Sequence, residues 1–333
     1  MIFGGEMDSS RELTIQDALN EALRTEMRRD ERVFCMGEDI AIYGGAYGVT
    51  KGLLDEFGAE RVRDTAISEA AIIGAGVGAA MTGMRPVVEL MYVDFAGIAM
   101  DQIYNQAAKI RYMFGGKAKV PLVIRTQGGT GKQIAAQHSN SLEAWFLHIP
   151  GLKTVMPSTP YDAKGLLISA IRDDNPVMFI EHKAIYNEKG PCPEGDYTVP
   201  IGKAAIRRPG TDATIVSYSR MALRSMSAAE TLAGEGISCE VIDLRTISPW
   251  DTLAVVESVA KTHRAVIVEE GTRTGGVGAE ISTRIMEMAF DELDAPVERV
   301  AGVDTVIPAS ATLEAAAIPN VESIIAAVRR TLQ

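Results

Sequence analysis

A carboxyl group, Glu69, stands at the start of a long run of small and apolar residues, DTAISEAAIIGAGVGAAMTG at 64–83. An acid at a helix start is commonly stabilised by the helix dipole alone, but a carboxyl group in apolar surroundings can also exchange a proton with a bound molecule. The same run contains Gly74-x-Gly76-x-x-Ala79, and Asp94 lies 20 residues beyond Gly74. The stretch therefore allows acid–base chemistry, close helix packing or dinucleotide binding.

The context of the glycines disfavours a dinucleotide site. That fingerprint needs a buried strand that leads directly into the first glycine, so that the pyrophosphate meets a helix N-terminus. Here the preceding residues are RVRDTAISEAAII, and the apolar run that begins after Glu69 is continuous with the glycines. The pattern predicts that the glycines lie inside a helix, where the lack of side chains allows close packing.

Two further glycine-rich stretches follow apolar runs. GGTGK at 128–132 lacks two parts of a phosphate loop, because Thr126 stands where the first glycine belongs and Gln133 follows the lysine. We predict a loop after a strand there. TGGVGAEIS at 274–282 could seat an anion at a helix start near Gly276, or form a tight strand-to-helix turn.

These residues need a scaffold, and the sequence alternates helix and strand patterns. Apolar residues at helical spacing predict a helix over 13–29 with Thr14 as its cap, and short apolar runs such as RVFCMGED and NPVMFIEH predict buried strands. This alternation predicts an α/β fold with two doubly wound, mainly parallel-sheet domains. We place the domains at residues 1–190 and 203–333, with a linker at 191–202 that is rich in proline and glycine.

Composition limits the partners. The chain has 333 residues, 47% of them hydrophobic, and a net charge of −11 without an evident basic patch, so nucleic acid and anionic membranes are poor partners. Cys35, Cys192 and Cys239 form no Cys-x-x-Cys pair and are predicted to be free thiols. No apolar stretch reaches the length of a membrane span, and MIFGGEMDSSREL lacks the pattern of a signal peptide. We expect a cytoplasmic protein.

Seven blocks together carry a resemblance. They are MGEDIAIYGGAYGVTKGL, DTAISEAAIIGAGVGAA, YNQAAKIRYMFGG, AAQHSNSLEAWF, PGLKTVMPSTPYDAKGLLISAIRDDNPV, VIDLRTISPWD and GVGAEIS. In this order, from about Leu13 to the end, the chain resembles the beta subunit of the thiamine-diphosphate-dependent first component of 2-oxo acid dehydrogenase complexes. ELMYVDFAGIAMDQIYNQAAKIRYMFGGKAKVP is most similar to the acetoin dehydrogenase branch, then to the pyruvate branch. The resemblance implies a pyrimidine-binding domain followed by a transketolase C-terminal-like domain.

The resemblance assigns acid–base roles to two carboxyl groups. Glu69, in the ISE motif, corresponds to the residue that contacts the pyrimidine ring nitrogen of thiamine diphosphate and promotes the imino form that activates the cofactor. A water-poor pocket, with apolar neighbours, suits a carboxyl group that shares a proton. Glu38, in GED, corresponds to an acid near the cofactor in a proton path between paired sites. The family usually has proline where Ala66 stands, so this loop is less stiff here.

Other residues are implied to surround the cofactor and the substrate. Phe95 corresponds to the aromatic residue that stacks on the pyrimidine, while Met91 and the backbone of Ile67 correspond to its neighbours. His138, in QHSNSL, corresponds to a histidine that faces the substrate and the incoming lipoyl group. An imidazole can donate a hydrogen bond or a proton near neutral pH.

The resemblance also implies ions. A monovalent cation, with potassium as the candidate, would be held by backbone oxygens of Leu122, Ala170, Asp173 and Asn175. A helix that ends at Asn175-Pro176 would explain the same residues. The family holds magnesium and the diphosphate through a GDG…N motif, which this chain lacks. Magnesium is therefore expected mainly on a separate alpha subunit.

The expected assembly is an alpha2beta2 heterotetramer with a beta–beta contact, docked on a dihydrolipoyl acyltransferase core. With its alpha subunit, the chain would cleave acetoin or oxidatively decarboxylate pyruvate and transfer the acetyl group to lipoyl. One alternative is a split transketolase half acting on sugar phosphates, although AAQHSNSLEAWF offers no clear basic phosphate-binding set. Another is a non-catalytic dinucleotide-binding module.

Overall fold

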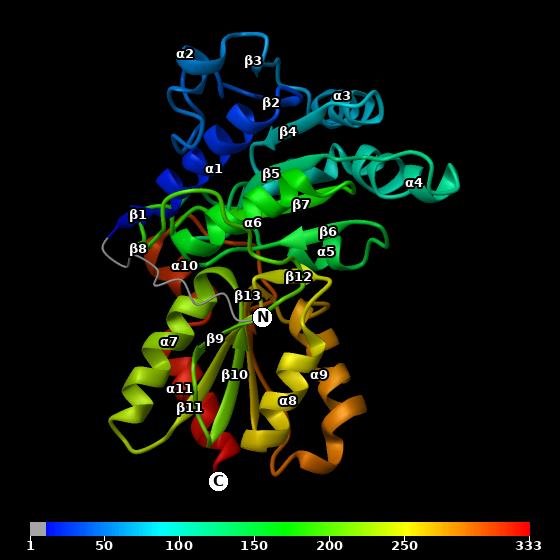
Figure 1. The fold of residues 1–333 in the computed structure, drawn as a ribbon. Helices are drawn as coiled ribbons and strands as arrows, with labels where there is room; N and C mark the ends of the chain where they lie inside the picture. The colour runs from blue at the N-terminus through cyan, green and yellow to red at the C-terminus, as the bar shows by residue number, and fades with distance from the viewer. Residues whose placement is uncertain (1–10) are drawn as a thin grey trace.

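The computed structural model describes residues 11–333 and shows two α/β bodies stacked on one another (Figure 1). A seven-stranded sheet forms the centre of the first body. All neighbouring strands in this sheet are parallel except the pair at one edge, β12 and β6, which is antiparallel. In spatial order the strands are β12 (Thr246–Ser248), β6 (Lys153–Val155), β7 (Val177–His182), β5 (Val123–Gly128), β4 (Arg85–Leu90), β2 (Val33–Gly37) and β3 (Val62–Asp64).

Helices cover both faces of this sheet. On one face, α1 (Ile15–Arg29) packs against α6 (Pro160–Arg172) in one apolar cluster. The predicted cap of α1 is confirmed, because the Thr14 side chain accepts a hydrogen bond of 3.0 Å from the Asp17 N–H. The other face is covered by α3 (Glu69–Met81), with α4 (Ile110–Met113) and α5 (Glu143–Leu147) beyond it. The remaining elements of this body are α2 (Leu53–Phe57), the 3-10 turn η1 (Val93–Gly97), the π-helical segment η2 (Gln102–Ala107) and the antiparallel pair β1 (Glu12–Thr14) and β8 (Lys189–Pro191).

A five-stranded sheet forms the second body, parallel except for β9 at its edge. Helices α7 and α11 pack on one face, and α8 and α9 pack on the other (Figure 1). The predicted α/β architecture with two mainly parallel sheets is confirmed. The strands in spatial order are β14 (Glu298–Gly302), β13 (Ala265–Thr272), β10 (Ala213–Ser217), β11 (Cys239–Asp243) and β9 (Ala205–Arg208), and the helices are α7 (Ser219–Ala233), α8 (Thr252–Thr262), α9 (Val277–Ala289), η3 (Phe290–Glu292), α10 (Ala311–Ala317) and α11 (Val321–Thr331).

Strand β12 joins the two bodies. It follows β11 in the chain, yet it pairs with β6 of the first sheet, where Thr246 lies opposite Val155. The Met156 N–H donates a hydrogen bond of 2.8 Å to the Arg245 carbonyl beside this pair. One apolar cluster also runs from α3 and β4 into β10 and α8. The division at residues 190 and 203 stays a prediction, and the two bodies share both a sheet and a core across it.

Two local predictions need comment. The sequence AGIAMDQIYNQAAKIRYMFGG at 96–116 predicts one helix with a glycine stop. The structure divides it into η1, η2 and α4, although Gly115 and Gly116, both with positive φ, do end it. The stretch 311–331 is long and apolar enough to cross a membrane by composition, but it forms two helices with a break after Ala317. Within that stretch α11 packs on α7 and β14, so its apolar side faces the protein core. The three cysteines are free, as predicted, and all three are buried.

Candidate active site

Four parallel strands bring most of the predicted site residues to one edge of the first sheet. Glu38 follows β2, Glu69 follows β3 and Met91 follows β4. The loop that carries His138 follows β5, between Gly129 and Asn140. The carboxyl ends of parallel strands form the crevice in which α/β proteins bind ligands. The topology therefore explains why residues from such distant segments gather there.

The segments that carry Glu38 and Glu69 are fastened side by side. The Thr65 N–H donates a hydrogen bond of 2.9 Å to the Gly37 carbonyl, and the Ala41 N–H donates one of 2.7 Å to the Asp64 carboxylate. Glu69 is the first residue of α3 and is only 7% exposed, whereas Ile67, just before it, is 80% exposed. The carboxyl group is thus sheltered at a helix start, behind an open loop.

Glu38 is buried with an unpartnered oxygen. No group among the described residues donates to its Oε1. Burial raises the pKa of Glu38, and the nearby carboxylates of Glu69, Asp39 and Glu89 raise it further. Buried carboxyl oxygens normally have hydrogen-bond partners, so this cluster of acids fits a ligand that brings its own donors, as the amino group of a pyrimidine does.

His138 and Phe95 are in contact. Their ring centroids lie 5.3 Å apart at an interplanar angle of 83°, and the Tyr92 ring lies 5.4 Å from the same imidazole. Phe95 belongs to η1 and is only partly buried, and Met91 lies beside Tyr92 at the end of β4. The structure thus brings Phe95 and His138, two of the residues that the sequence placed around the cofactor and the substrate, into contact in the segments that follow β4 and β5.

Among the glycines after Glu69, Gly76 serves close packing, as the sequence predicts. Gly74 and Gly76 lie within α3, and no strand leads directly into Gly74. A methyl group on Gly76 would stand 2.9 Å from Val88 Cγ1 and 3.0 Å from Leu122 Cδ1, so the helix can approach β4 only without a side chain there. The geometry required for a dinucleotide site is missing.

The other two glycine-rich stretches also prove structural. The start of α9 is already satisfied internally, because the Gly278 N–H donates a hydrogen bond of 2.8 Å to Glu269 Oε2. That carboxylate stands where an anion would have bound. GGTGK forms the end of β5 and a loop, as predicted, and Gly129 has a φ of +83°.

The four predicted cation ligands lie near the amino end of β7. The Leu122 carbonyl accepts the Val177 N–H at 2.9 Å, and the Ala170 carbonyl accepts the Asp173 N–H at 3.3 Å. Arg85 Nη1 donates to the Asp173 carbonyl at 3.1 Å, and Arg111 donates to the Asn175 side chain at 2.6 Å. Each carbonyl oxygen has two lone pairs, so these oxygens keep limited capacity for an alkali ion. Residues 11–333 contain no cluster of His, Cys, Asp or Glu that could hold a metal.

Sequence reasoning missed a buried ion network beneath the site. The Arg125 guanidinium, 1% exposed, donates to Glu89 at 2.8 Å and to Glu181 at 2.6 Å. Tyr186 donates to the second oxygen of Glu181 at 2.5 Å. The available signal was a charged residue near the end or the middle of each of three strands that are buried, which is uncommon unless the charges are paired.

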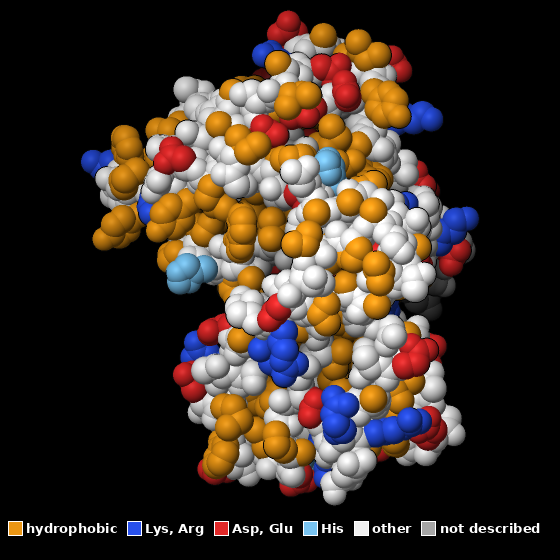
Figure 2. All heavy atoms as spheres, turned by 180° about the vertical axis from the view of Figure 1, so that it is seen from behind, with side chains coloured by type: hydrophobic (Ala, Val, Ile, Leu, Met, Phe, Trp, Pro, Cys, Tyr) orange, Lys and Arg blue, Asp and Glu red, His pale blue; other side chains and the backbone are white. Residues whose placement is uncertain are grey.

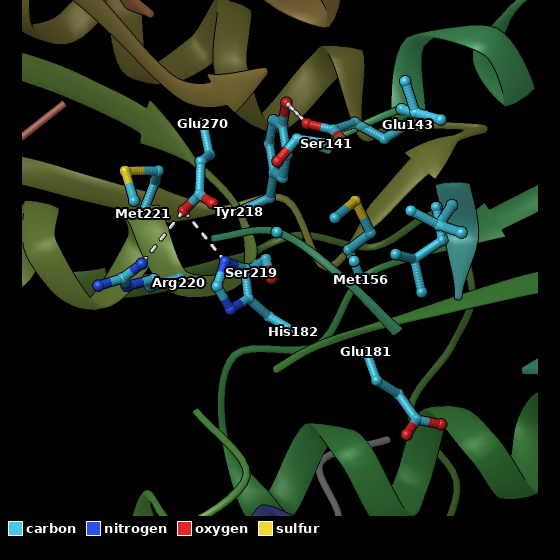
Figure 3. A pocket seen from close by; sticks show the side chains of 15 residues that line it. Ser141, Glu143, Met156, Glu181, His182, Tyr218, Ser219, Arg220, Met221 and Glu270 are labelled. Carbon is cyan, nitrogen blue, oxygen red and sulfur yellow. Dashed lines mark hydrogen bonds and ion pairs between the residues drawn. The ribbon is translucent and has the colours of Figure 1, made fainter. Parts of the chain in front are cut away.

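A second missed group surrounds a small cavity between the two bodies (Figure 3), with room for about one water molecule at roughly 10 Å³. Glu270 of β13 accepts hydrogen bonds from the Thr130 N–H at 2.7 Å and its hydroxyl at 2.9 Å, and it lies 3.0 Å from His182 Nε2. Burial would raise the pKa of Glu270, but the His182 imidazole, the Arg220 guanidinium and the Thr130 N–H together hold that pKa below its ordinary value. Glu270 of the second body thereby binds Thr130, at the start of the loop that carries His138.

Glu143, at the start of α5, lines the same cavity and is fully buried. The Tyr218 hydroxyl donates a hydrogen bond of 2.9 Å to its Oε1, and no described group contacts its Oε2 (Figure 3). Burial raises the pKa of Glu143 to about 7. This carboxyl group therefore changes its charge near neutral pH.

Exposed hydrophobic side chains gather on the side of the first body from which α4 projects (Figure 2). Tyr112 is 89% exposed. A contiguous exposed patch of this kind marks an interaction surface. Its large residues are Ile98, Tyr104, Tyr112, Met113 and Phe114.

Comparison with known proteins gives consistent matches. The chain matches the transketolase pyrimidine-binding domain over residues 11–189 and the transketolase C-terminal domain over residues 202–324. It is 50% identical to the acetoin:2,6-dichlorophenolindophenol oxidoreductase subunit beta of Cupriavidus necator, over 97% of this chain and 98% of that protein. It is 52% identical to the pyruvate dehydrogenase E1 component subunit beta of Rhizobium meliloti, over 95% of this chain and 69% of that protein.

Among solved structures, a split-gene transketolase described as an inactive beta4 tetramer superimposes with a TM-score of 0.77. The match covers 96% of this chain and 98% of that chain at 22% sequence identity. At this level of identity the likeness establishes the two-domain fold alone.

Proposed function

Because the chain belongs to the family of transketolase-like, thiamine-diphosphate-dependent beta subunits that includes the acetoin and pyruvate dehydrogenase components, we propose that it cleaves acetoin together with an alpha subunit. The acetyl group then passes to a lipoyl group on a dihydrolipoyl acyltransferase core, and pyruvate is the competing substrate. The alpha2beta2 assembly, the beta–beta contact and the cytoplasmic location belong to this proposal. The exposed apolar patch around α4 supports a partner on that side.

The observation that carries the proposal is the set of groups at the carboxyl edge of the first sheet. Glu69 is sheltered at a helix start, Glu38 beside it has an unpartnered buried oxygen, and the contact between Phe95 and His138 lies on the adjacent strands. Two carboxyl groups beside an aromatic ring and an imidazole can bind a flat heterocycle: the carboxyl groups accept hydrogen bonds from its ring nitrogen and its amino group, and the aromatic ring stacks on it.

In this proposal Glu69 holds a proton shared with the pyrimidine ring nitrogen, and Phe95 stacks on the ring. Met91 and the backbone of Ile67 bound the ring at its edges. Glu38 accepts a hydrogen bond and relays a proton. His138 donates a hydrogen bond or a proton to the oxygen that gains charge as the substrate reacts. Thiamine diphosphate, when bound, supplies the nucleophilic carbon that attacks the substrate carbonyl.

Ions complete the proposal. Magnesium is held mainly by the alpha subunit, together with the diphosphate end of the cofactor. Potassium would bind the backbone oxygens of Leu122, Ala170, Asp173 and Asn175. The first three of these oxygens each keep a lone pair beside their present donor. Potassium dependence of activity, compared with lithium at equal ionic strength, tests this part separately.

The test of the function is dye reduction by the chain assembled with its alpha subunit, thiamine diphosphate and magnesium. We expect acetoin-dependent reduction of 2,6-dichlorophenolindophenol, and a loss of at least about a hundredfold in Glu69→Gln because an acid–base group is removed. Glu60→Gln is the matched control, since its side chain is 94% exposed just before β3. Full activity of Glu69→Gln would show that Glu69 does not activate the cofactor.

Substrate choice needs a second comparison. Acetoin and pyruvate are assayed in parallel at equal enzyme, and faster turnover of pyruvate would reassign the branch without changing the family. Turnover of sugar phosphates without a lipoyl acceptor would instead favour a split transketolase half. The structural likeness to a split transketolase does not itself support that activity, because it reflects the fold.

A further inference from the structure

The loop that carries His138 is closed at its base. The Gly129 N–H donates a hydrogen bond of 2.9 Å to the Asn140 carbonyl, and the Asn140 N–H donates one of 3.1 Å to the Asp94 carboxylate. A methyl group on Gly129 would stand 2.2 Å from His182 Nε2, so the loop passes directly against that imidazole. These contacts fix both ends of the loop. Within the loop the His138 N–H donates a hydrogen bond of 3.3 Å to the Ala135 carbonyl, but none of these bonds joins the main chain at His138 to another segment of the protein.

Lys183 makes that contact. It directly follows β7, its side chain is 1% exposed, and its ammonium group donates a hydrogen bond to the His138 carbonyl. The same ammonium lies 4.9 Å from the centre of the Tyr92 ring. Tyr92 is one of the two aromatic residues against which the His138 imidazole rests. Lys183 thus touches both the backbone of His138 and a wall of its side-chain pocket.

The burial of this ammonium group is costly. Burial lowers the pKa of Lys183 to about 8, although the carboxylates of Asp94, Glu270 and Glu314 counteract the effect. No carboxylate in the described chain forms an ion pair with it, and a buried charge without a pair normally destabilises a protein. Such groups cluster at functional sites.

We propose that Lys183 is a positioning residue for His138, and that it holds the main chain so that the imidazole faces the reacting substrate and acyl acceptor. The proposal rests on the proposed function. Lys183 acts through the His138 carbonyl and the Tyr92 ring, without touching the substrate. If this is correct, replacing Lys183 lowers turnover in the enzyme that has the His138 imidazole, and has little further effect in an enzyme that lacks it.

The test compares two buried lysines in the assembled alpha–beta enzyme with thiamine diphosphate. Lys164 is 0% exposed, donates to the Pro193 carbonyl at 2.9 Å and lies 4.9 Å from the Tyr197 ring, but it is remote from the site edge and pairs with Glu21. Lys183→Met should lower kcat at least about tenfold, because small misplacements of catalytic groups are costly. Lys164→Met should change kcat less than about twofold.

A double-mutant cycle separates positioning from general damage. When Lys183→Met is added to His138→Asn, we expect less than about a twofold further change in kcat, because contacting residues that act as a unit are not additive. The proposal would be overturned if the fold-losses of kcat in the two single variants multiplied in the double variant. It would also be overturned by an unchanged kcat in Lys183→Met.

The outcomes also distinguish this inference from the proposed function. An inactive wild-type enzyme with every substrate would overturn the function, whereas an active wild type together with a Lys183→Met enzyme of unchanged kcat overturns the inference alone. Thermal unfolding and co-purification of the alpha subunit check that each variant is assembled. Should Lys183→Met fail to assemble, Lys183→Leu replaces it under the same criteria.

Discussion

Glu143 offers a direct test of how burial shifts a titration in this fold. The carboxyl group is fully buried, with one hydrogen bond from Tyr218 and one unpartnered oxygen, and its pKa is raised from 4.5 to about 7. Below about pH 4.5 it is protonated in both the folded and the unfolded chain. As the pH rises from about 4.5 to about 7, the unfolded chain releases the proton while the folded chain keeps it, so folding stability falls.

The size of the effect follows from the shift. Each unit between the pKa of Glu143 in the unfolded chain and its pKa in the folded chain is worth about 1.4 kcal/mol of folding free energy. The loss of folding stability above pH 7 therefore reaches about 3 kcal/mol. At about 2.1 cal/mol/K per residue, unfolding of 333 residues carries an entropy of about 0.7 kcal/mol/K, which converts the loss into about 4 °C of Tm.

Glu143→Gln removes this titration and keeps an acceptor for the Tyr218 hydroxyl. Its amide nitrogen replaces the unpartnered oxygen, which costs about 1–3 kcal/mol at every pH. We therefore predict that the Tm of the variant, relative to wild type, rises by about 4 °C between about pH 4.5 and pH 8. Thermal unfolding at a series of pH values, at constant ionic strength, measures this difference.

The test is how the Tm difference between Glu143→Gln and wild type changes with pH. A Tm difference that is the same at every pH reflects the unpartnered amide nitrogen and does not test the titration. Glu60→Gln is the control, because its side chain is 94% exposed and its Tm difference from wild type should stay constant with pH. A Glu143→Gln difference that is equally flat would refute the reasoning, since the buried carboxyl group would then titrate like an exposed one.

Two further predictions concern packing beneath the site. Arg125→Met should lower stability by about 3–5 kcal/mol, because it leaves two buried carboxylates without their shared partner, and urea unfolding measures the loss. Gly76→Ala should lower stability by about 1–3 kcal/mol, because the added methyl group meets Val88 and Leu122 at 3.0 Å or less, and the Tm reports it.

Matched controls exist for both substitutions. Arg284→Met breaks exposed pairs with Glu280 and Glu287 and should cost less than about 1 kcal/mol, so an equal loss in Arg125→Met would contradict the role of burial. Gly78 lies in the same helix as Gly76 with no heavy atom within 4 Å of an added methyl group. Gly78→Ala should stabilise α3 by up to about 1 kcal/mol, and equal behaviour of the two alanine variants would contradict the packing argument.

The sequence predicted the parts of the fold that depend on local patterns. The Thr14 cap, the helix around Gly76 and the buried strands β5 and β7 follow from apolar spacing and from glycine and proline positions. The pattern did not predict β12 in the first sheet, because its partner β6 lies about 90 residues earlier and each strand has only three residues. The interrupted helix over 96–116 likewise reflects tertiary packing.

For the site, residues near strand ends could be predicted together, and residues joined by long-range contacts could not. Glu38 and Glu69 follow adjacent parallel strands, so their proximity follows from the topology. Glu270 reaches Thr130 across 140 residues, and no local pattern connects them. Lys183 directly follows a strand, but a single lysine there gives no sign that it is buried against the His138 backbone.

The pairing of β12 with β6 has a consequence for how the chain can be divided. A chain that ends at residue 202 would keep six strands of the first sheet and lose the seventh. Strand β6 would then present open N–H and C=O groups to solvent, and such an edge invites pairing with another copy. The first body is therefore expected to aggregate when it is produced without the second, even though it keeps all of its own helices.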